Sequence, residues 1–227
     1  MKHALAYEWF RVRSLRSTWL LLAGAGAVQF ASGLYWGLKR DLGSLDAFTS
    51  AFGLTDRVGA LLVAAVGVAA FGLDHQHGTL ATTKLVLRSP ARIVGARALV
   101  TAGLGLGGGV LMAVLTAAGV LTGGGALPAG AGAAGRAVAG VLLLTVLSGL
   151  AGVALGGLLR HTGPAIGVFA VWVFVAETAL AALGGVPMTA LPFSGTALSA
   201  PSGTGVFAGL VAAGLAVVTF TLPRRDG

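Results

Sequence analysis

Few side chains in this 227-residue chain could do chemistry, and the carboxylate of Glu177 is the most isolated of them. It interrupts an otherwise uncharged, apolar run from Gly163 to Gly184. A carboxylate inside an apolar helix is costly unless it is paired or hydrated, so each one requires an explanation. Two roles are equally compatible with the sequence: Glu177 faces a substrate pathway or a partner subunit, or it is a structural carboxylate that binds a neighbouring helix.

The sequence gives little support for a metal site or for a catalytic nucleophile. Asp74, His75 and His77 lie close together, but residues at i and i+2 do not share a helix face, which favours an interfacial polar cluster over a metal site. The chain has no cysteine, which excludes thiolate ligands and disulfides. The serine in "FSGT" (193–196) has no histidine after it in the chain that could act as a base. The sequence therefore predicts no catalytic residue, no bound metal and no cofactor in this chain.

A nucleotide-binding loop is also missing from the sequence. The only lysines are Lys2, Lys39 and Lys84, and none follows a glycine. The phosphate-binding pattern G-x-x-x-x-G-K-[ST] is therefore absent. We expect that this chain is not an ATPase, and more generally not an enzyme.

Composition identifies the class of protein that must hold these residues. Only 10% of the residues are charged and 56% are apolar, with a further 38 glycines. A soluble domain averages about 25% charged residues, and a disordered chain has low hydrophobicity and high charge. The net charge of +8 is dispersed along the chain, which disfavours nucleic-acid binding. We therefore predict an all-α, polytopic membrane protein that contacts the lipid bilayer and binds no nucleic acid.

Gaps between charges locate the expected spans. About 20 apolar residues in a helix are needed to cross the hydrocarbon core of a bilayer. Six transmembrane helices satisfy this length, at about 18–38, 54–73, 98–122, 137–159, 163–184 and 203–222. Within these spans many glycines recur at i and i+4, which permits close helix packing. Chance produces many such pairs, so no dimer seam can be identified.

The basic residues set the expected orientation. With the N-terminus inside, eleven of the fifteen Lys and Arg residues lie on the cytoplasmic side, as the positive-inside rule requires. This arrangement places the C-terminus inside as well. Asp41, Asp46 and Asp56 would then balance the basic residues outside, which leaves Glu177 as the one ionisable group inside a span.

Three segments outside the spans are distinctive. Residues 1–16 predict an interfacial elbow helix, in which Trp9 suits the membrane interface and Arg13 and Arg16 are its basic residues. Residues 74–97 form the largest cytoplasmic loop, which either docks a soluble partner or only fixes topology. Residues 185–202 are uncharged and broken by prolines, and predict one or two re-entrant helices between spans five and six; a surface loop is the alternative.

Several of these segments together resemble a known family. They are "RSLRSTW" (13–19), "FGLDHQHGTLATTKLVLRSPARIVGARALV" (71–100), "WVFVAE" (172–177) and "LPFSGTAL" (191–198). With them the chain resembles the membrane subunits of ATP-binding-cassette exporters of the type-2 permease family, in the short form typical of actinobacteria. The most specific part is the "HGT…TT" loop, although Asp74 stands where relatives carry Glu.

The resemblance implies a division of labour. A separate cytoplasmic ATPase subunit would bind ATP and Mg and dock on the elbow helix and on a coupling helix. A second permease copy or a paralogue would complete the pathway, in a bacterial plasma membrane. The coupling element would comprise Asp74, His77, Gly78, Thr79, Leu80, Thr82 and Thr83. A non-transporting assembly or immunity factor, or a small intramembrane enzyme, remains as an alternative function.

Overall fold

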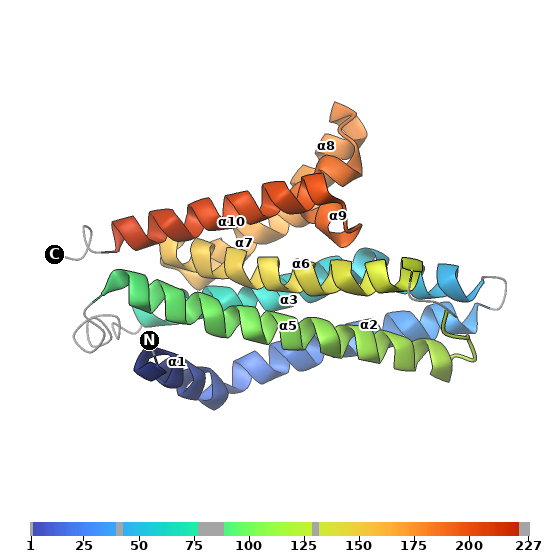
Figure 1. Ribbon diagram of the computed structural model, residues 1–227, viewed down its shortest axis with the longest axis horizontal. Coiled ribbons are helices and arrows are strands. Elements are labelled where there is room, and N and C mark those ends of the chain that lie inside the picture. Colours follow the sequence, from blue (N-terminus) through green and yellow to red (C-terminus); the bar gives the residue numbers. More distant parts are fainter. Residues whose placement is uncertain (1, 40–42, 77–88, 129–131, 223–227) are drawn as a thin grey trace.

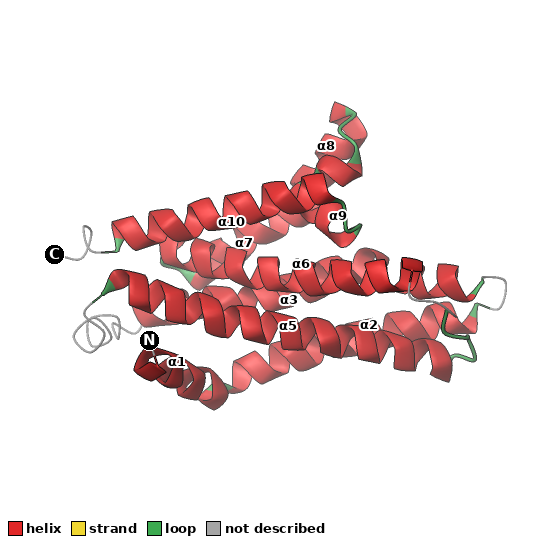
Figure 2. Cartoon of the chain, in the orientation of Figure 1, coloured by secondary structure: helices red, strands yellow, loops and turns green. Residues whose placement is uncertain are grey.

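The structure is a computed structural model that describes residues 2–39, 43–76, 89–128 and 132–222. Every regular element in this part of the chain is a helix, and it contains no strand (Figure 2). The helices run back and forth along one long axis to form a bundle (Figure 1). The predicted all-α fold is confirmed for these residues.

A short helix, α1 (Lys2–Ser14), precedes the bundle and is separated from it by Leu15, whose backbone is extended. The long helices are α2 (Arg16–Leu38), α3 (Ser44–Gln76), α5 (Pro90–Thr122), α6 (Gly132–Leu159) and α10 (Pro201–Thr221). A continuous helical segment consists of α7 (Thr162–Val171), the π-helix η1 (Trp172–Ala176) and α8 (Glu177–Gly184). The 3-10 helix η2 (Met188–Ala190) and the short α9 (Pro192–Ala197) connect it to α10.

Within the described residues, five helical segments are long and apolar enough to cross a membrane. They are Ser44–Gly72, Pro90–Thr122, Gly132–Leu159, Thr162–Gly184 and Pro201–Thr221. The remaining predicted span corresponds to α2, which has 23 residues but does not belong to this set. Six spans were predicted, and five have the required length and hydropathy.

The helices α3 and α5 begin ten and eight residues before their predicted spans, and α6 begins five residues before its own. The helix α3 starts at Ser44 and continues through a kink at Gly53, where the backbone leaves helical geometry. The helix α5 starts at Pro90, because proline suits the first helical turn, where its missing N–H would have no partner. The charges that delimited these two spans in the sequence therefore lie inside helices.

Glycines allow two pairs of helices to approach backbone to backbone. A Cβ atom at Gly33 in α2 would collide with the carbonyl oxygen of Thr116 in α5, and one at Gly119 in α5 would collide with that of Phe30 in α2. The same relationship joins α3 and α6, where a Cβ at Gly152 would collide with the carbonyl oxygen of Ala64. These close approaches are the packing that small residues permit in membrane helices.

Other glycine pairs have open space where a side chain would be. They are Gly103 and Gly107 in α5, Gly163 and Gly167 in the α7 region, and Gly205 and Gly209 in α10. These pairs have the same i, i+4 spacing as glycines that do pack against a neighbouring helix. Spacing alone therefore did not reveal which glycines pack inside the chain.

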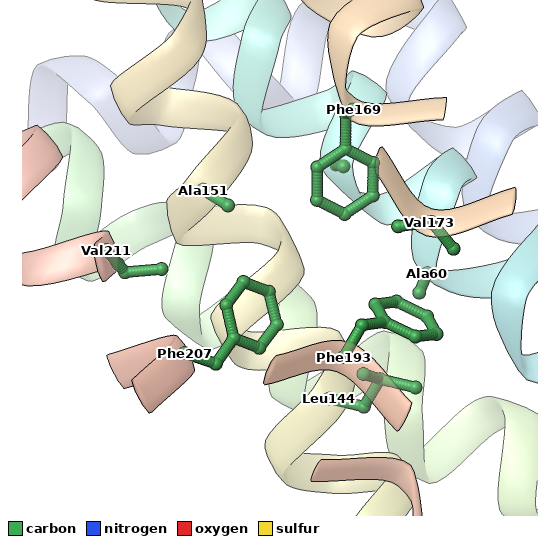
Figure 3. Close-up of a cluster of buried hydrophobic side chains, with 9 residues drawn as sticks. Ala60, Leu144, Ala151, Phe169, Val173, Phe193, Phe207 and Val211 are labelled. Carbon is green, nitrogen blue, oxygen red and sulfur yellow. The ribbon is translucent and has the colours of Figure 1, made fainter. Parts of the chain in front are cut away.

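An aromatic cluster fixes the segment between α8 and α10 to the bundle. Phe193 of α9 is buried between Phe169 and Phe207, with ring centroids 6.5 and 6.4 Å away (Figure 3). Leu144 of α6 and Ala60 of α3 belong to the same cluster. Burying a large aromatic side chain provides much of the packing energy at such a site, so α9 is held inside the bundle rather than on its surface.

Candidate functional site

The carboxylate of Glu177 is fully buried and caps the helix α9. Its Oε1 accepts a hydrogen bond from the backbone N–H of Phe193 (2.6 Å), and its Oε2 accepts one from that of Ser194 (2.8 Å). The Ser194 hydroxyl also donates to Oε2 (2.7 Å). The first N–H groups of a helix have no partner within the helix, and Leu191 at the N-cap makes no side-chain cap hydrogen bond. Glu177 supplies these missing acceptors from another segment.

This geometry supports the structural role that the sequence left open for Glu177. The carboxylate fixes the short helices between α8 and α10. These are two helical elements in the region where one or two were predicted. Glu177 does not line the adjoining cavity described below, so the geometry offers no support for direct contact with a cargo molecule.

The π-helix η1 lies directly before Glu177 and changes its backbone hydrogen bonding. The Glu177 N–H donates to the carbonyl of Trp172, five residues back, rather than to that of Val173. The guanidinium of Arg57 takes the place of this N–H as the donor to Val173, because Arg57 Nη1 lies 2.8 Å from the Val173 carbonyl oxygen. Single π-turns inside membrane-length helices occur frequently at functional sites.

Arg57 also connects to the carboxylate through a shared hydroxyl. Its NH1 donates to Thr178 Oγ1 (3.0 Å) and its NH2 to Ser194 Oγ (3.3 Å). The Ser194 hydroxyl in turn donates a hydrogen bond to Glu177, so the three side chains form a chain of donors and acceptors. No carboxylate in the described part of the protein lies within ion-pair distance of Arg57.

A cavity of about 540 Å³ adjoins this network. Its lining includes the start of α6, which lies at the end of the bundle away from the start of α1 and the end of α10 (Figure 1). The cavity lies between the first half of α3, the start of α6 and the segment from η2 to α9. Its polar lining includes Arg57, Arg136, Asp56 and Ser194. Its apolar lining includes Phe52, Leu54, Met188, Phe193 and Leu198.

Asp56 is buried beside this cavity, where a balancing charge of an outer loop was expected. Its Oδ1 accepts a hydrogen bond from Gln29 Nε2 (2.6 Å), and Gln29 Oε1 accepts bonds from Thr55 and Thr116. Asp56 and Arg57 both belong to a helix of membrane-spanning length. In the described residues, Glu177 is therefore not the only ionisable side chain of a helix that could cross a membrane.

A second charged cluster lies at the opposite end of the bundle and joins α1 to α5. Arg97 of α5 and Glu8 of α1 are both buried, and Arg97 Nε donates to Glu8 Oε1 over 3.1 Å. Arg11 binds the other carboxylate oxygen at 2.8 Å. The Arg97 guanidinium also stacks on the ring of Phe71, 4.1 Å from its centroid.

The residues predicted for the elbow helix are exposed on or beside α1. Trp9 is 46% exposed, and Arg13 and Arg16 are exposed as well. Arg16 is the first residue of α2 rather than part of α1. Trp19 closes the corner by donating its indole N–H to the carbonyl of Arg13 (3.2 Å).

Most of the predicted coupling element lies outside the described residues. This applies to His77, Gly78, Thr79, Leu80, Thr82 and Thr83. Asp74 belongs to the last turns of α3, and nothing is described of its side chain or of that of His75. Their predicted role in ATPase coupling, and the polar cluster of Asp74, His75 and His77, stay predictions.

Sequence reasoning missed Arg57, Asp56, Glu8 and Arg97 as site residues. Asp56, Arg57 and Arg97 lie where an uncharged run begins, so their charges were used to locate the runs, and Glu8 lies among the basic residues of the N-terminal segment. No family model matches the chain, and no curated protein and no solved structure is significantly similar to it.

Proposed function

We propose that this chain is the membrane-spanning permease subunit of an ATP-driven exporter, and that it forms half of a translocation pathway. The observation that carries the proposal is the buried contact between Glu8 and Arg97. It joins the two segments that the family resemblance assigns to ATPase docking. One is the elbow helix, and the other is the start of α5, directly after the coupling loop.

The course of the helices supports six spans rather than five. Figure 1 shows α2 running beside α5 from its corner with α1. Its 23 residues are enough to cross a hydrocarbon core of about 30 Å. The glycine contacts at Gly33 and Gly119 hold it there. With α2 counted, the start of α1, the end of α3, the start of α5 and the end of α10 lie at one end of the bundle (Figure 1). We assign this end to the cytoplasm, because most of the described basic residues belong to the parts of the helices that meet there.

In the proposed mechanism, ATP is bound and hydrolysed by a separate subunit. Closure of the paired ATPase subunits displaces the coupling loop and the elbow helix. The buried Glu8–Arg97 pair makes α1 and α5 move together, because separating them would leave an uncompensated charge in an apolar environment. Two permease chains then rock against one another and expose the cargo outward. The bacterial plasma membrane is the proposed location.

The test is to purify the tagged full-length chain from its native membranes in mild detergent. We expect a second subunit that carries a phosphate-binding loop to co-purify, and the complex to hydrolyse ATP. Replacing Leu80 or Thr83 with Asp should reduce the amount of this subunit at an unchanged yield of the chain. Gly135→Asp is the matched control, because it adds the same charge at the exposed, opposite end of the bundle.

Two results would overturn the proposal. One is the absence of any ATPase subunit from a chain that purifies folded. The other is full retention of the ATPase by both loop variants. Either result would favour a non-transporting assembly or immunity factor instead. ATP-independent turnover by the chain alone in lipid would favour the intramembrane enzyme.

A further inference from the structure

We propose that the cavity between α3, α6 and α9 binds an amphipathic anion, a molecule with one acidic head and an apolar body. The proposal that the cavity binds this ligand follows from the geometry of the cavity alone. The proposal that the bound molecule is the exported cargo rests on the proposed function. Three properties of the cavity support an anionic, amphipathic ligand: the charge of its lining, the hydrogen-bond donors that remain there, and the size and apolarity of the remaining space.

The charge of the lining is positive. Arg57 and Arg136 both line the cavity, and neither forms an ion pair with the described part of the chain. Among the described residues, Asp56 is the only acidic one of the lining. Even if Asp56 is counted as fully ionised, one net positive charge remains on the lining itself. The carboxylate of Glu177 lies behind the lining and is occupied by hydrogen bonds from Phe193 and Ser194. The groups that face a ligand therefore favour an anion over a cation.

Both guanidinium groups retain donors for a ligand. A guanidinium has five N–H groups in a planar fork that suits carboxylates and phosphates. Arg57 makes three hydrogen bonds, all to neutral oxygens, from its two terminal nitrogens. The Arg136 side chain makes none with the described residues, although its backbone carbonyl accepts a bond from Ser199.

The remainder of the lining suits an apolar body. Phe52, Leu54, Met188, Phe193 and Leu198 surround the space. A volume of about 540 Å³ lies in the usual range for small-molecule sites, about 300–1,000 Å³. A fully polar anion such as inorganic phosphate would leave these side chains unmatched, whereas an acid with an alkyl chain would cover them and reach both arginines.

The experiment uses the full-length chain in phosphatidylcholine liposomes and a diazirine-bearing dodecanoate as a photoreactive probe. We expect saturable labelling of peptides from 49–57 and 188–198. Dodecanoate and dodecyl phosphate should compete with it, whereas dodecanol and dodecyltrimethylammonium should not. Adding phosphatidylglycerol as a further competitor distinguishes a membrane lipid from a free lipophilic acid as the source of the anion.

Arg136→Gln is the test variant, because this side chain is exposed and makes no hydrogen bond or ion pair with the described residues. It should raise the half-saturating probe concentration about tenfold, the effect of one lost charge-assisted contact. Lys39→Gln is the matched control. It removes the same charge at the end of α2, outside the cavity lining, and should leave labelling unchanged.

Three results would overturn the assignment: non-saturable labelling, equal competition by dodecanol, or an unchanged half-saturating concentration in Arg136→Gln. The measurement requires no ATPase subunit. Its failure is therefore distinguishable from failure of the proposed function, which is measured by co-purification and ATP hydrolysis. An anion site without an ATPase partner would leave the binding assignment standing and remove only the cargo interpretation.

Discussion

The guanidinium of Arg57 lies 2.8 Å from the carbonyl oxygen of Val173, which the N–H of Glu177 would occupy in an uninterrupted α-helix. The side chain from α3 thus completes the backbone hydrogen bonding of another span. Arg57→Met should leave this carbonyl without its donor and destabilise the fold by about 1–3 kcal/mol. Unfolding of the reconstituted protein by titration with sodium dodecyl sulfate measures this change.

The matched control for Arg57 is Arg136→Met. This variant removes the same group from an exposed position where it makes no hydrogen bond with the described residues. Its unfolding free energy should stay within about 0.5 kcal/mol of the parent. Equal losses in the two variants would show that Arg57 does not support the π-helix.

Glu177→Gln tests the cap on α9. An amide has only one oxygen for the donors that the carboxylate now accepts from Phe193 and Ser194, and its NH₂ group would face an N–H. We expect a loss of about 1–3 kcal/mol in unfolding free energy. Asp46→Asn, an exposed carboxylate at the start of α3, should change little. A stable Glu177→Gln protein that no longer exports would instead return Glu177 to a role in the pathway.

A double-mutant cycle on Glu8 and Arg97 tests the coupling of α1 to α5. Removing one partner of a buried pair costs about 3–5 kcal/mol, because the other charge stays buried. Glu8→Gln and Arg97→Gln should therefore each be strongly destabilising, and the double variant should lose less than their sum. Arg13→Gln, on an exposed side chain of the same helix, is the control. Strict additivity would mean that the pair does not couple the two helices.

Glycine substitutions test the packing of α3 against α6. Gly152→Val should cost about 3 kcal/mol or prevent folding, since its side chain would meet the backbone of Ala64. Gly103→Val places the same side chain in open space and should be tolerated. Thermal unfolding in detergent measures both. Similar midpoints would show that the close approach of α3 and α6 is not required.

Composition predicted the helical class and most helix ends, because apolar length and proline act locally. The predicted span at 137–159, for example, ends where α6 ends. The positions of Asp56 and Arg57 could not be predicted in this way. Their partners Gln29 and Val173 are 27 and 116 positions away in the chain, and only the fold brings them together.

The residues of the candidate site, too, could be predicted only in part from the sequence. Glu177 was recognisable because a lone carboxylate in an apolar run needs an explanation. Its partners were not, because they are backbone N–H groups, which every residue except proline has. The π-helix that aligns Arg57 with Val173 left no mark in the sequence "WVFVA".

The glycine contacts also determine which parts of this bundle can slide. Within the α2–α5 and α3–α6 pairs, backbone carbonyls of one helix lie where a glycine of the other helix has no side chain. A shift along the helix axis would therefore make the two backbones collide. The helix α7 has no such interlock at Gly163 and Gly167, and α10 has none at Gly205 and Gly209, whereas Gly203 at the start of α10 abuts the carbonyl of Leu191. Rearrangement is therefore least costly along α7 and along α10 beyond its first turn.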